Sequence, residues 1–152
     1  FPVDMEVANM NTVKILFVDD EKPFVDTMTK RLKKREIDVV PAHDGFEALS
    51  RLEENSDVEV VILDIKMPNM DGMTALKEIK NKFPLIEVIM LTGHATVETG
   101  IEGMKMGAFD YLMKPCDMDQ LIAKVNEASK RKRDQEEKIM EARMQAITLR
   151  RP

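Results

Sequence analysis

The chain has 152 residues, the size of one ordinary domain with a short appendage, and its 43% of hydrophobic residues is enough for a packed core. No apolar run approaches the roughly 20 residues that span a bilayer, so we expect no membrane helix, and the single cysteine, Cys116, excludes an internal disulfide and fits a cytoplasmic protein. The net charge of −5 combines an acidic body, residues 1–128, with a basic tail, residues 129–152; because nucleic-acid binding needs a clustered basic face, we expect no direct contact with nucleic acid.

The chain divides into three regions. Residues 1–11 do not begin with Met and have neither the basic start nor the apolar run of a signal peptide, so we interpret them as a tag or a disordered leader. Residues 12–130 have the patterns of one folded domain. Residues 131–152 are expected to form a charged helical extension.

Five apolar runs of strand length follow one another along the domain. Val60-Val61-Ile62-Leu63 is continuously apolar and rich in β-branched residues, which is typical of a parallel strand buried on both faces. We therefore expect it to be a central strand. The five expected strands are Lys14–Val18, Asp38–Pro41, Val58–Leu63, Glu87–Leu91 and Ala108–Met113.

Segments with helical periodicity separate and follow these strands. The signals for helix starts and stops are Pro23 in a first turn, Asp44 with Glu47 in capping-box spacing, Asp71-Gly72, Gly107 just past a C-terminus, and Asp117 with Gln120 three residues on. The second helix is expected to bury Phe46, Leu49 and Leu52. In the other four, the apolar residues that set the period are Phe24, Met28 and Leu32; Met73, Leu76 and Ile79; Val97, Ile101 and Met104; and Leu121 and Val125.

Five strands that alternate with five helices predict an α/β fold in which a parallel sheet carries helices on both faces. Ligands bind to such folds beyond the carboxyl ends of the strands. Four of the five expected strands end in polar residues, which would meet at that edge: Asp19-Asp20-Glu21, Asp64, Thr92-Gly93 and Lys114-Pro115.

Three carboxylates at one edge indicate a cation site. Asp19, Asp20 and Asp64 would repel one another strongly at low dielectric, and a divalent cation relieves that repulsion. Oxygen ligands favour Mg²⁺, with Mn²⁺ as a possible substitute, over Zn²⁺. His43 begins a helix and His94 lies past the strand end, so neither is expected to be a ligand.

Taken together and in order, these residues resemble the receiver domain of bacterial two-component response regulators. The similarity covers roughly Lys14 to Lys130. The motifs that carry it are Val18-Asp19-Asp20, Leu63-Asp64-Ile65-Lys66-Met67-Pro68, Asp71-Gly72, Leu91-Thr92-Gly93-His94, Gly107-Ala108-Phe109-Asp110-Tyr111 and Lys114-Pro115.

The resemblance implies a fold and a role for each site residue. The fold is flavodoxin-like and doubly wound, with five parallel strands in the order 2-1-3-4-5 and an extended last helix. The implied roles are Asp64 as phosphoacceptor; Asp20, Asp64, the backbone carbonyl of Lys66 and, mainly through water, Asp19 as Mg²⁺ ligands; Thr92 and Lys114 as phosphoryl contacts; Tyr111 as the aromatic switch; and a cis bond before Pro115.

The resemblance also implies partners. A sensor histidine kinase or a phosphotransfer protein would supply the phosphoryl group, and phosphorylation would repack the face built from the fourth helix, the fifth strand and the fifth helix. The only expected chemistry is self-phosphorylation and slow autodephosphorylation, so the chain is not expected to be a turnover enzyme. Small Gly93 would leave an approach path for a bulky phosphohistidine, and the Lys66 side chain would lie at the rim.

The extension reads as a solvated charged run, residues 131–138, followed by an apolar stripe. Ile139, Ala142, Ala146 and Leu149 have heptad spacing, and Met140, Met144 and Ile147 widen the stripe. Because so short an isolated helix is marginal in water, the stripe favours a partner: a second copy, the domain body or an output domain. The alternative is a frayed tail. We expect a possible homodimer through residues 131–150 or through the fourth and fifth helices.

Two other functions compete with the receiver interpretation. An aspartate-nucleophile phosphohydrolase carries its two Asp residues two positions apart after the first strand, whereas here Asp19 and Asp20 are adjacent and Asp64 follows the third. A scaffold that has lost phosphorylation usually lacks an acidic residue or the lysine, and this chain keeps both. The sequence does not identify the kinase, the stimulus or the output, although Leu91-Thr92-Gly93-His94 resembles receivers of transcriptional activators that work with the alternative sigma factor, and of hybrid kinases.

Overall fold

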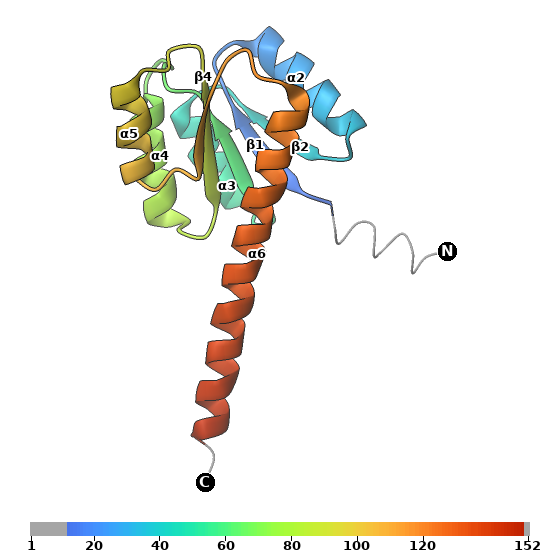
Figure 1. Cartoon of the computed structure of the whole chain (residues 1–152), viewed down its shortest axis with the longest axis vertical. Helices are drawn as coiled ribbons and strands as arrows, with labels where there is room; N and C mark the ends of the chain where they lie inside the picture. The colour runs from blue at the N-terminus through green and yellow to red at the C-terminus, as the bar shows by residue number, and fades with distance from the viewer. Residues whose placement is uncertain (1–11, 151–152) are drawn as a thin grey trace.

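A computed structural model describes residues 12–150 of the chain (Figure 1). The expected tag or leader, residues 1–11, lies outside the described residues, as do residues 151–152. Within the described residues, five strands alternate with five helices, numbered here as in Figure 1. No helix in residues 12–150 is both long enough and apolar enough to cross a bilayer.

The strands form one parallel sheet in the order β2-β1-β3-β4-β5. All four residues of β3 are buried, which confirms the central strand predicted from its continuous apolar run. The expected starts at Val58 and Ala108 are each two residues early. The strands are β1 Lys14–Val18, β2 Asp38–Ala42, β3 Val60–Leu63, β4 Glu87–Thr92 and β5 Asp110–Met113.

Helices cover both faces of the sheet, as predicted. Helices α2 and α6 pack on the side that carries Ile15, Phe17 and Ile62, and α3 and α4 pack on the opposite side, which carries Leu16 and Leu63. Helix α5 lies beside β5 on that second side (Figure 1). The helices are α2 Lys22–Lys34, α3 Gly45–Glu54, α4 Gly72–Lys82, α5 Val97–Lys105 and α6 Met118–Leu149.

Most helix ends form where the sequence signals place them. The Asp44 carboxylate accepts from the backbone N–H of Glu47 at 2.8 Å, and Asp71 caps α4 in the same way. Helix α6 does start after Asp117, but that side chain makes no cap hydrogen bond. Gly107 ends α5 with φ +100°, a conformation that glycine adopts at little cost.

One prediction about a buried helix face is wrong, and the apolar period of a second helix is exposed. Phe46 is 58% exposed, because α3 turns Gly45, Ala48 and Leu52 toward the core. On α5 the apolar period is on the outside: Val97 is 76% exposed. Gly103 is the only buried residue of that helix.

Helix α6 continues without a break to Leu149 (Figure 1). The charged run at its middle is not merely solvated. Arg133 donates to both carboxylate oxygens of Glu59 at 2.8 and 2.7 Å, and Ser129 donates to the same carboxylate. Arg131 pairs with the buried Glu87 at 3.4 Å. We call these five residues the basal clamp, because Glu59 and Glu87 stand at the amino ends of β3 and β4.

Candidate functional site

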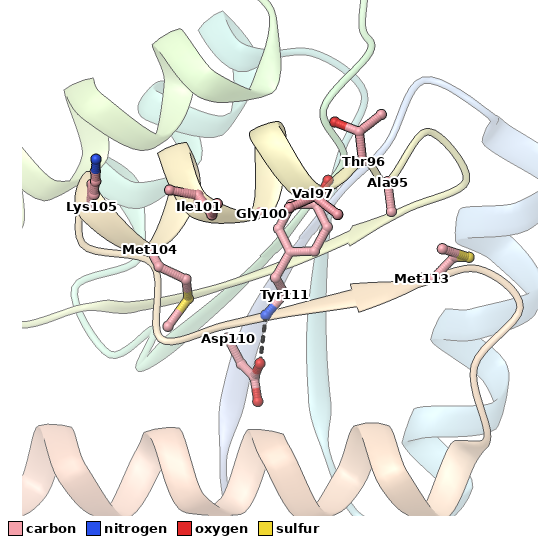
Figure 2. Close-up of a pocket in the computed structure, with 10 residues that line it drawn as sticks. All are labelled: Ala95, Thr96, Val97, Gly100, Ile101, Met104, Lys105, Asp110, Tyr111 and Met113. Carbon is pink, nitrogen blue, oxygen red and sulfur yellow. Dashed lines mark hydrogen bonds between the residues drawn. The ribbon is translucent and has the colours of Figure 1, made fainter.

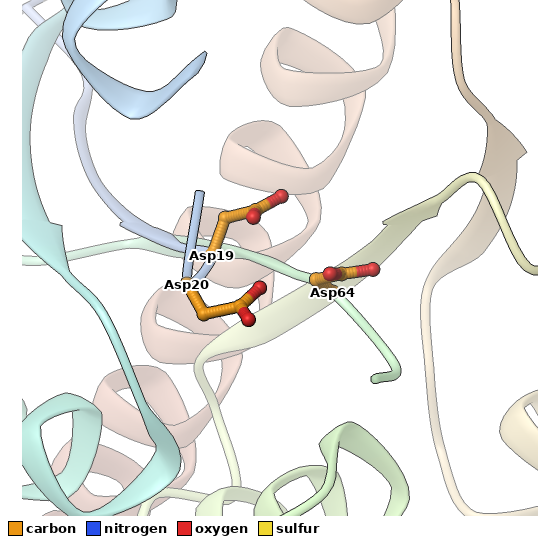
Figure 3. Close-up of side chains that lie close together, drawn as sticks. All are labelled: Asp19, Asp20 and Asp64. Carbon is orange, nitrogen blue, oxygen red and sulfur yellow. The ribbon is translucent and has the colours of Figure 1, made fainter. Parts of the chain in front are cut away.

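Three carboxylates meet at the carboxyl edge of the sheet (Figure 3). Asp19 and Asp20 follow β1, Asp64 follows β3, and these two strands are hydrogen-bonded neighbours. One oxygen from each carboxylate lies within 4.8 Å of the others. Asp19 and Asp64 are buried, whereas Asp20 is exposed. The predicted acidic cluster therefore exists, and it opens to solvent on the side of Asp20.

Close backbone packing fixes Asp64. Its carboxylate accepts from the N–H of Ile65 at 2.9 Å, and the N–H of Gly72 donates to the Ile65 carbonyl at 2.6 Å. A Cβ at Gly72 would lie 2.0 Å from the Asp64 carbonyl oxygen, far inside contact distance. Glycine at this position is thus what allows the start of α4 to lie against the backbone of Asp64.

Asp19 is held by a lysine from the far end of the sheet. Its two oxygens accept from the Lys114 ammonium at 2.5 Å and from the N–H of Glu21 at 2.9 Å. Burial raises the pKa of Asp19 above its usual value, and the charge of Asp64 adds to the rise, although Lys114 and the Glu21 N–H act in the opposite direction. The net shift of this pKa is upward because the effect of burial is the largest of these.

Lys114 lies between an acidic and an aromatic neighbour. Its ammonium is 4.3 Å from the ring centre of Phe24, and Glu21 lies 3.6 Å away on the outer side. Burial alone would lower the pKa of Lys114, but the hydrogen bond and charge of Asp19, with Asp64 and Glu21, outweigh it, so the net shift is upward. The ammonium therefore stays charged. The Lys114–Pro115 peptide bond is cis.

Thr92 ends β4 and is fully buried. Its hydroxyl oxygen accepts from the N–H of His94 at 3.1 Å, and its carbonyl accepts from the N–H of Lys114 at 2.8 Å. The second bond ties the backbones of two predicted site residues together. His94 itself is exposed, and the His43 ring contacts the Asp19 carbonyl at 3.2 Å rather than its carboxylate.

Tyr111 lies on β5, one strand over from Thr92. It pairs in register with Met90, so Tyr111, Met90 and Thr92 share one face of the sheet. The ring points toward α5 and borders a shallow apolar groove of about 740 Å³ (Figure 2). Val97, Ile101 and Met113 line the same groove.

The donor set fits a hard divalent cation. Three carboxylates supply only oxygen, two of them are buried, and one is open to water. Mg²⁺ prefers this kind of site, because it keeps several waters and binds through a few carboxylates. Asp19, Asp20 and Asp64 are the side chains that could hold it. The exposed Lys66 lies two residues past Asp64 in the loop that leads to α4.

Some residues around the site were not found from the sequence. Phe24 was assigned to a helix period, and nothing in its spacing indicates the Lys114 contact. Thr99, which contacts the Tyr111 hydroxyl at 2.6 Å, had one available signal, its three-residue spacing from Thr96, since the pair forms a capping box.

The fold and site define a class: a doubly wound, flavodoxin-like protein with an acidic pocket at the edge of β1 and β3, where the strand order reverses. The family model of the response regulator receiver domain matches residues 15–126. The chain belongs to this family.

The similar proteins agree with this assignment. Transcriptional regulatory protein ZraR of Escherichia coli (strain K12) is 37% identical over 118 residues, which cover 78% of this chain. The chain spans only about a quarter, 26%, of the length of that relative.

Solved structures show the same fold. A response regulator receiver domain protein from Clostridium thermocellum is 39% identical with a TM-score of 0.76, over 80% of this chain and 97% of that one. A Borrelia burgdorferi complex of CheX, CheY, BeF₃ and Mg²⁺ matches at 28% identity and a TM-score of 0.71, over 74% of this chain and 86% of that one.

Proposed function

We propose that this receiver domain accepts a phosphoryl group on Asp64 and relays that event through β4 and β5 to the face formed by α5, β5 and α6. The observation that carries the proposal is the meeting of Asp64 with Asp19, Asp20 and Lys114 at one edge of the sheet. The alternatives are less consistent with this arrangement. A phosphohydrolase would carry both aspartates after the first strand, and a scaffold without phosphorylation would not need the full acidic set.

In the proposed step, a carboxylate oxygen of Asp64 attacks the phosphorus of a partner's phosphohistidine. The new O–P bond forms as the N–P bond breaks, and the imidazole that leaves takes up a proton. Aspartate is a weak nucleophile, so the site must act mainly by positioning and by neutralising charge. Loss of the phosphoryl group to water would return the domain to its starting state.

Residues around Asp64 support this step because they could supply the positive charge that it needs. Asp19, Asp20, Asp64 and the Lys66 carbonyl would hold Mg²⁺, or Mn²⁺ in its place, which when bound neutralises phosphoryl oxygens. Lys114 would exchange its pairing with Asp19 for pairing with the phosphoryl group. The Borrelia burgdorferi complex, which contains BeF₃ and Mg²⁺, supports this chemistry by similarity.

The relay follows from the strand pairing. The phosphoryl group would draw the Thr92 hydroxyl toward Asp64, and Tyr111, on the same face of the neighbouring strand, would move toward the vacated space. The groove beside Tyr111 would then change shape. The coupling energy of such switches is a few kcal/mol, typically about 1–3 kcal/mol.

The partners proposed are a sensor histidine kinase or a phosphotransfer protein as donor, and an output domain or a target protein at the switching face. A homodimer is a second candidate, supported by the exposed apolar residues of α5 and of the end of α6. Sedimentation of the chain with and without residues 134–152 tests it. A mass that equals one chain at every concentration in both forms contradicts it.

The phosphoacceptor assignment is tested by labelling with acetyl phosphate and Mg²⁺. Asp64→Asn is expected to abolish the label, because the amide is not a nucleophile. Asp71→Asn is the matched control, since it makes the same chemical change at an exposed cap where Asn serves as well. Full, acid-stable label on Asp64→Asn refutes the proposal.

A further inference from the structure

The ring of Tyr111 lies against the inner face of α5 at the two glycines of that helix. A Cβ built on Gly100 would lie 3.7 Å from the ring, and one on Gly103 would also lie 3.7 Å from it, so the two glycines leave a flat surface that the ring covers (Figure 2). The apolar residues Val97, Ile101 and Met104 of α5 are largely exposed and border the groove beside the ring. The packing of this helix on the domain therefore depends strongly on where Tyr111 stands.

One hydroxyl connects the ring to the helix start. The Thr99 oxygen Oγ1 lies 2.6 Å from the Tyr111 hydroxyl and 2.9 Å from the Thr96 hydroxyl, and it accepts from the backbone N–H of Thr96 at 3.0 Å. Thr96 in turn caps α5 by accepting from the N–H of Thr99 at 3.1 Å. Thr99 thus belongs both to the capping box of α5 and to the hydrogen bond that orients Tyr111.

In the proposed relay, movement of Tyr111 away from α5 breaks this bond. The phenol contacts Thr99 while the ring lies against α5, and a ring that turned toward Thr92 would leave the helix start. The Thr99 and Tyr111 hydroxyls are partly buried, so water does not fully replace the bond when it breaks. The bond therefore favours the ring position against α5 over a position turned toward Thr92. A typical net hydrogen bond of about 1 kcal/mol corresponds to about a fivefold change in that balance.

We propose that Thr99 is a positioning residue that holds Tyr111 in its docked position on α5 and thereby sets how readily the domain switches. The effect on switching rests on the relay proposed above, whereas the contact that holds Tyr111 against α5 does not depend on that relay. The new element is Thr99, the residue that opposes the movement of Tyr111. Thr92, which would contact the phosphoryl group, ends β4, and Thr99, which opposes the switch, lies in the first turn of α5 beyond the connecting loop.

The composition of the chain provides a specific probe. Tyr111 is the single tyrosine and there is no tryptophan. Incorporation of 3-fluorotyrosine therefore gives one ¹⁹F NMR signal from the protein, that of Tyr111, which is followed beside the separate signals of fluoride and beryllofluoride. Beryllofluoride with Mg²⁺, a stable phosphoryl mimic, is titrated while this signal is followed.

Three variants separate the hydrogen bond from the helix cap. Thr99→Val removes both the bond to Tyr111 and its part in the capping box. Thr96→Val weakens the capping box but leaves the Tyr111 partner in place, so it is the matched control. Thr99→Ser keeps the hydroxyl and is the conservative rescue.

We expect Thr99→Val to shift the ¹⁹F signal of the free domain toward its beryllofluoride-bound position and to tighten the apparent affinity for beryllofluoride by up to about fivefold, because the competent population rises. Thr99→Ser should stay near wild type, and Thr96→Val should leave the affinity within about twofold. An unchanged signal and affinity in Thr99→Val overturn the inference. So does an equal shift in Thr96→Val, which would assign the effect to helix capping.

The experiment also separates this inference from the relay. If beryllofluoride with Mg²⁺ leaves the wild-type signal unmoved while Thr99→Val shifts it in the free domain, the relay is wrong and the Thr99 contact stands. If the wild-type signal responds and Thr99→Val changes neither measurement, the relay stands and the inference is wrong.

Discussion

Replacing Gly72 with alanine tests how closely α4 approaches the site. Its added Cβ would stand 2.0 Å from the Asp64 carbonyl oxygen and 2.6 Å from the Ile65 Cα. Both neighbours are backbone atoms of a buried segment, so no flexible side chain can move aside. The start of α4 and the segment after β3 must therefore separate by roughly 1 Å to restore ordinary contact, an overpacking cost of about 1–3 kcal/mol.

Separation on this scale also breaks a hydrogen bond. The Gly72 N–H donates to the Ile65 carbonyl at 2.6 Å, and both groups are buried, so losing the bond costs about 1–3 kcal/mol more. We expect Gly72→Ala to lose about 3–4 kcal/mol of unfolding free energy. For a chain of this length, that corresponds to a fall in Tm on the order of 10 °C.

Urea unfolding followed by far-UV circular dichroism measures this loss by linear extrapolation. Gly93→Ala is the control, because a Cβ there meets nothing within 4 Å and its backbone is outside the left-handed region. We expect its stability to stay within about 0.5 kcal/mol of wild type. A loss below about 1 kcal/mol in Gly72→Ala, or equal losses in the two variants, would refute the close-approach argument.

Two further predictions concern the basal clamp and the rim of the site. A double-mutant cycle on Glu59→Gln and Arg133→Gln, measured by urea unfolding, should give a coupling energy of about 1–2 kcal/mol. The bidentate geometry strengthens the ion pair, whereas the 40% exposure of the Arg133 side chain weakens it. A coupling energy near zero contradicts the clamp. Gly93→Ala should slow phosphoryl transfer from a phosphohistidine protein at least several-fold more than transfer from acetyl phosphate, because only the bulky donor needs an open approach path. Equal slowing with the two donors contradicts the proposal that Gly93 keeps this path open.

The parts of the fold that the sequence predicts are those set by local chemistry. The apolar run at β3 requires burial on both faces, and the capping aspartates Asp44 and Asp71 start their helices by binding N–H groups three residues on. Polar residues just past strand ends must meet at one edge once the strands are parallel. Asp19, Asp64 and Lys114 were therefore predicted to converge, although they lie 45 and 50 residues apart in turn.

The parts that it does not predict depend on contacts between distant segments. Glu59 and Arg133 are 74 residues apart, and a basic run on a helix is equally consistent with full solvation. The stripe on α5 has the right period for a buried face, yet the ring of Tyr111 covers the inner side of the helix at Gly100 and Gly103, and the stripe stays exposed along the groove beside the ring. Periodicity shows that a face exists, but only the packing of the neighbours decides which way it points.

The basal clamp fixes the middle of α6 to the sheet, while the end of the helix extends beyond the domain. It attaches the helix at Glu59, just before β3, and at Glu87, the first residue of β4, and the same two strands lead to Asp64 and Thr92 at their other ends. A displacement of either strand would therefore tilt the helix about this attachment. From Arg133 to Leu149 the helix extends about 24 Å at about 1.5 Å per residue, so a tilt of about 5° would carry its tip through about 2 Å. A domain joined to that end of the helix would therefore be displaced by such a tilt more than the residues at the clamp are.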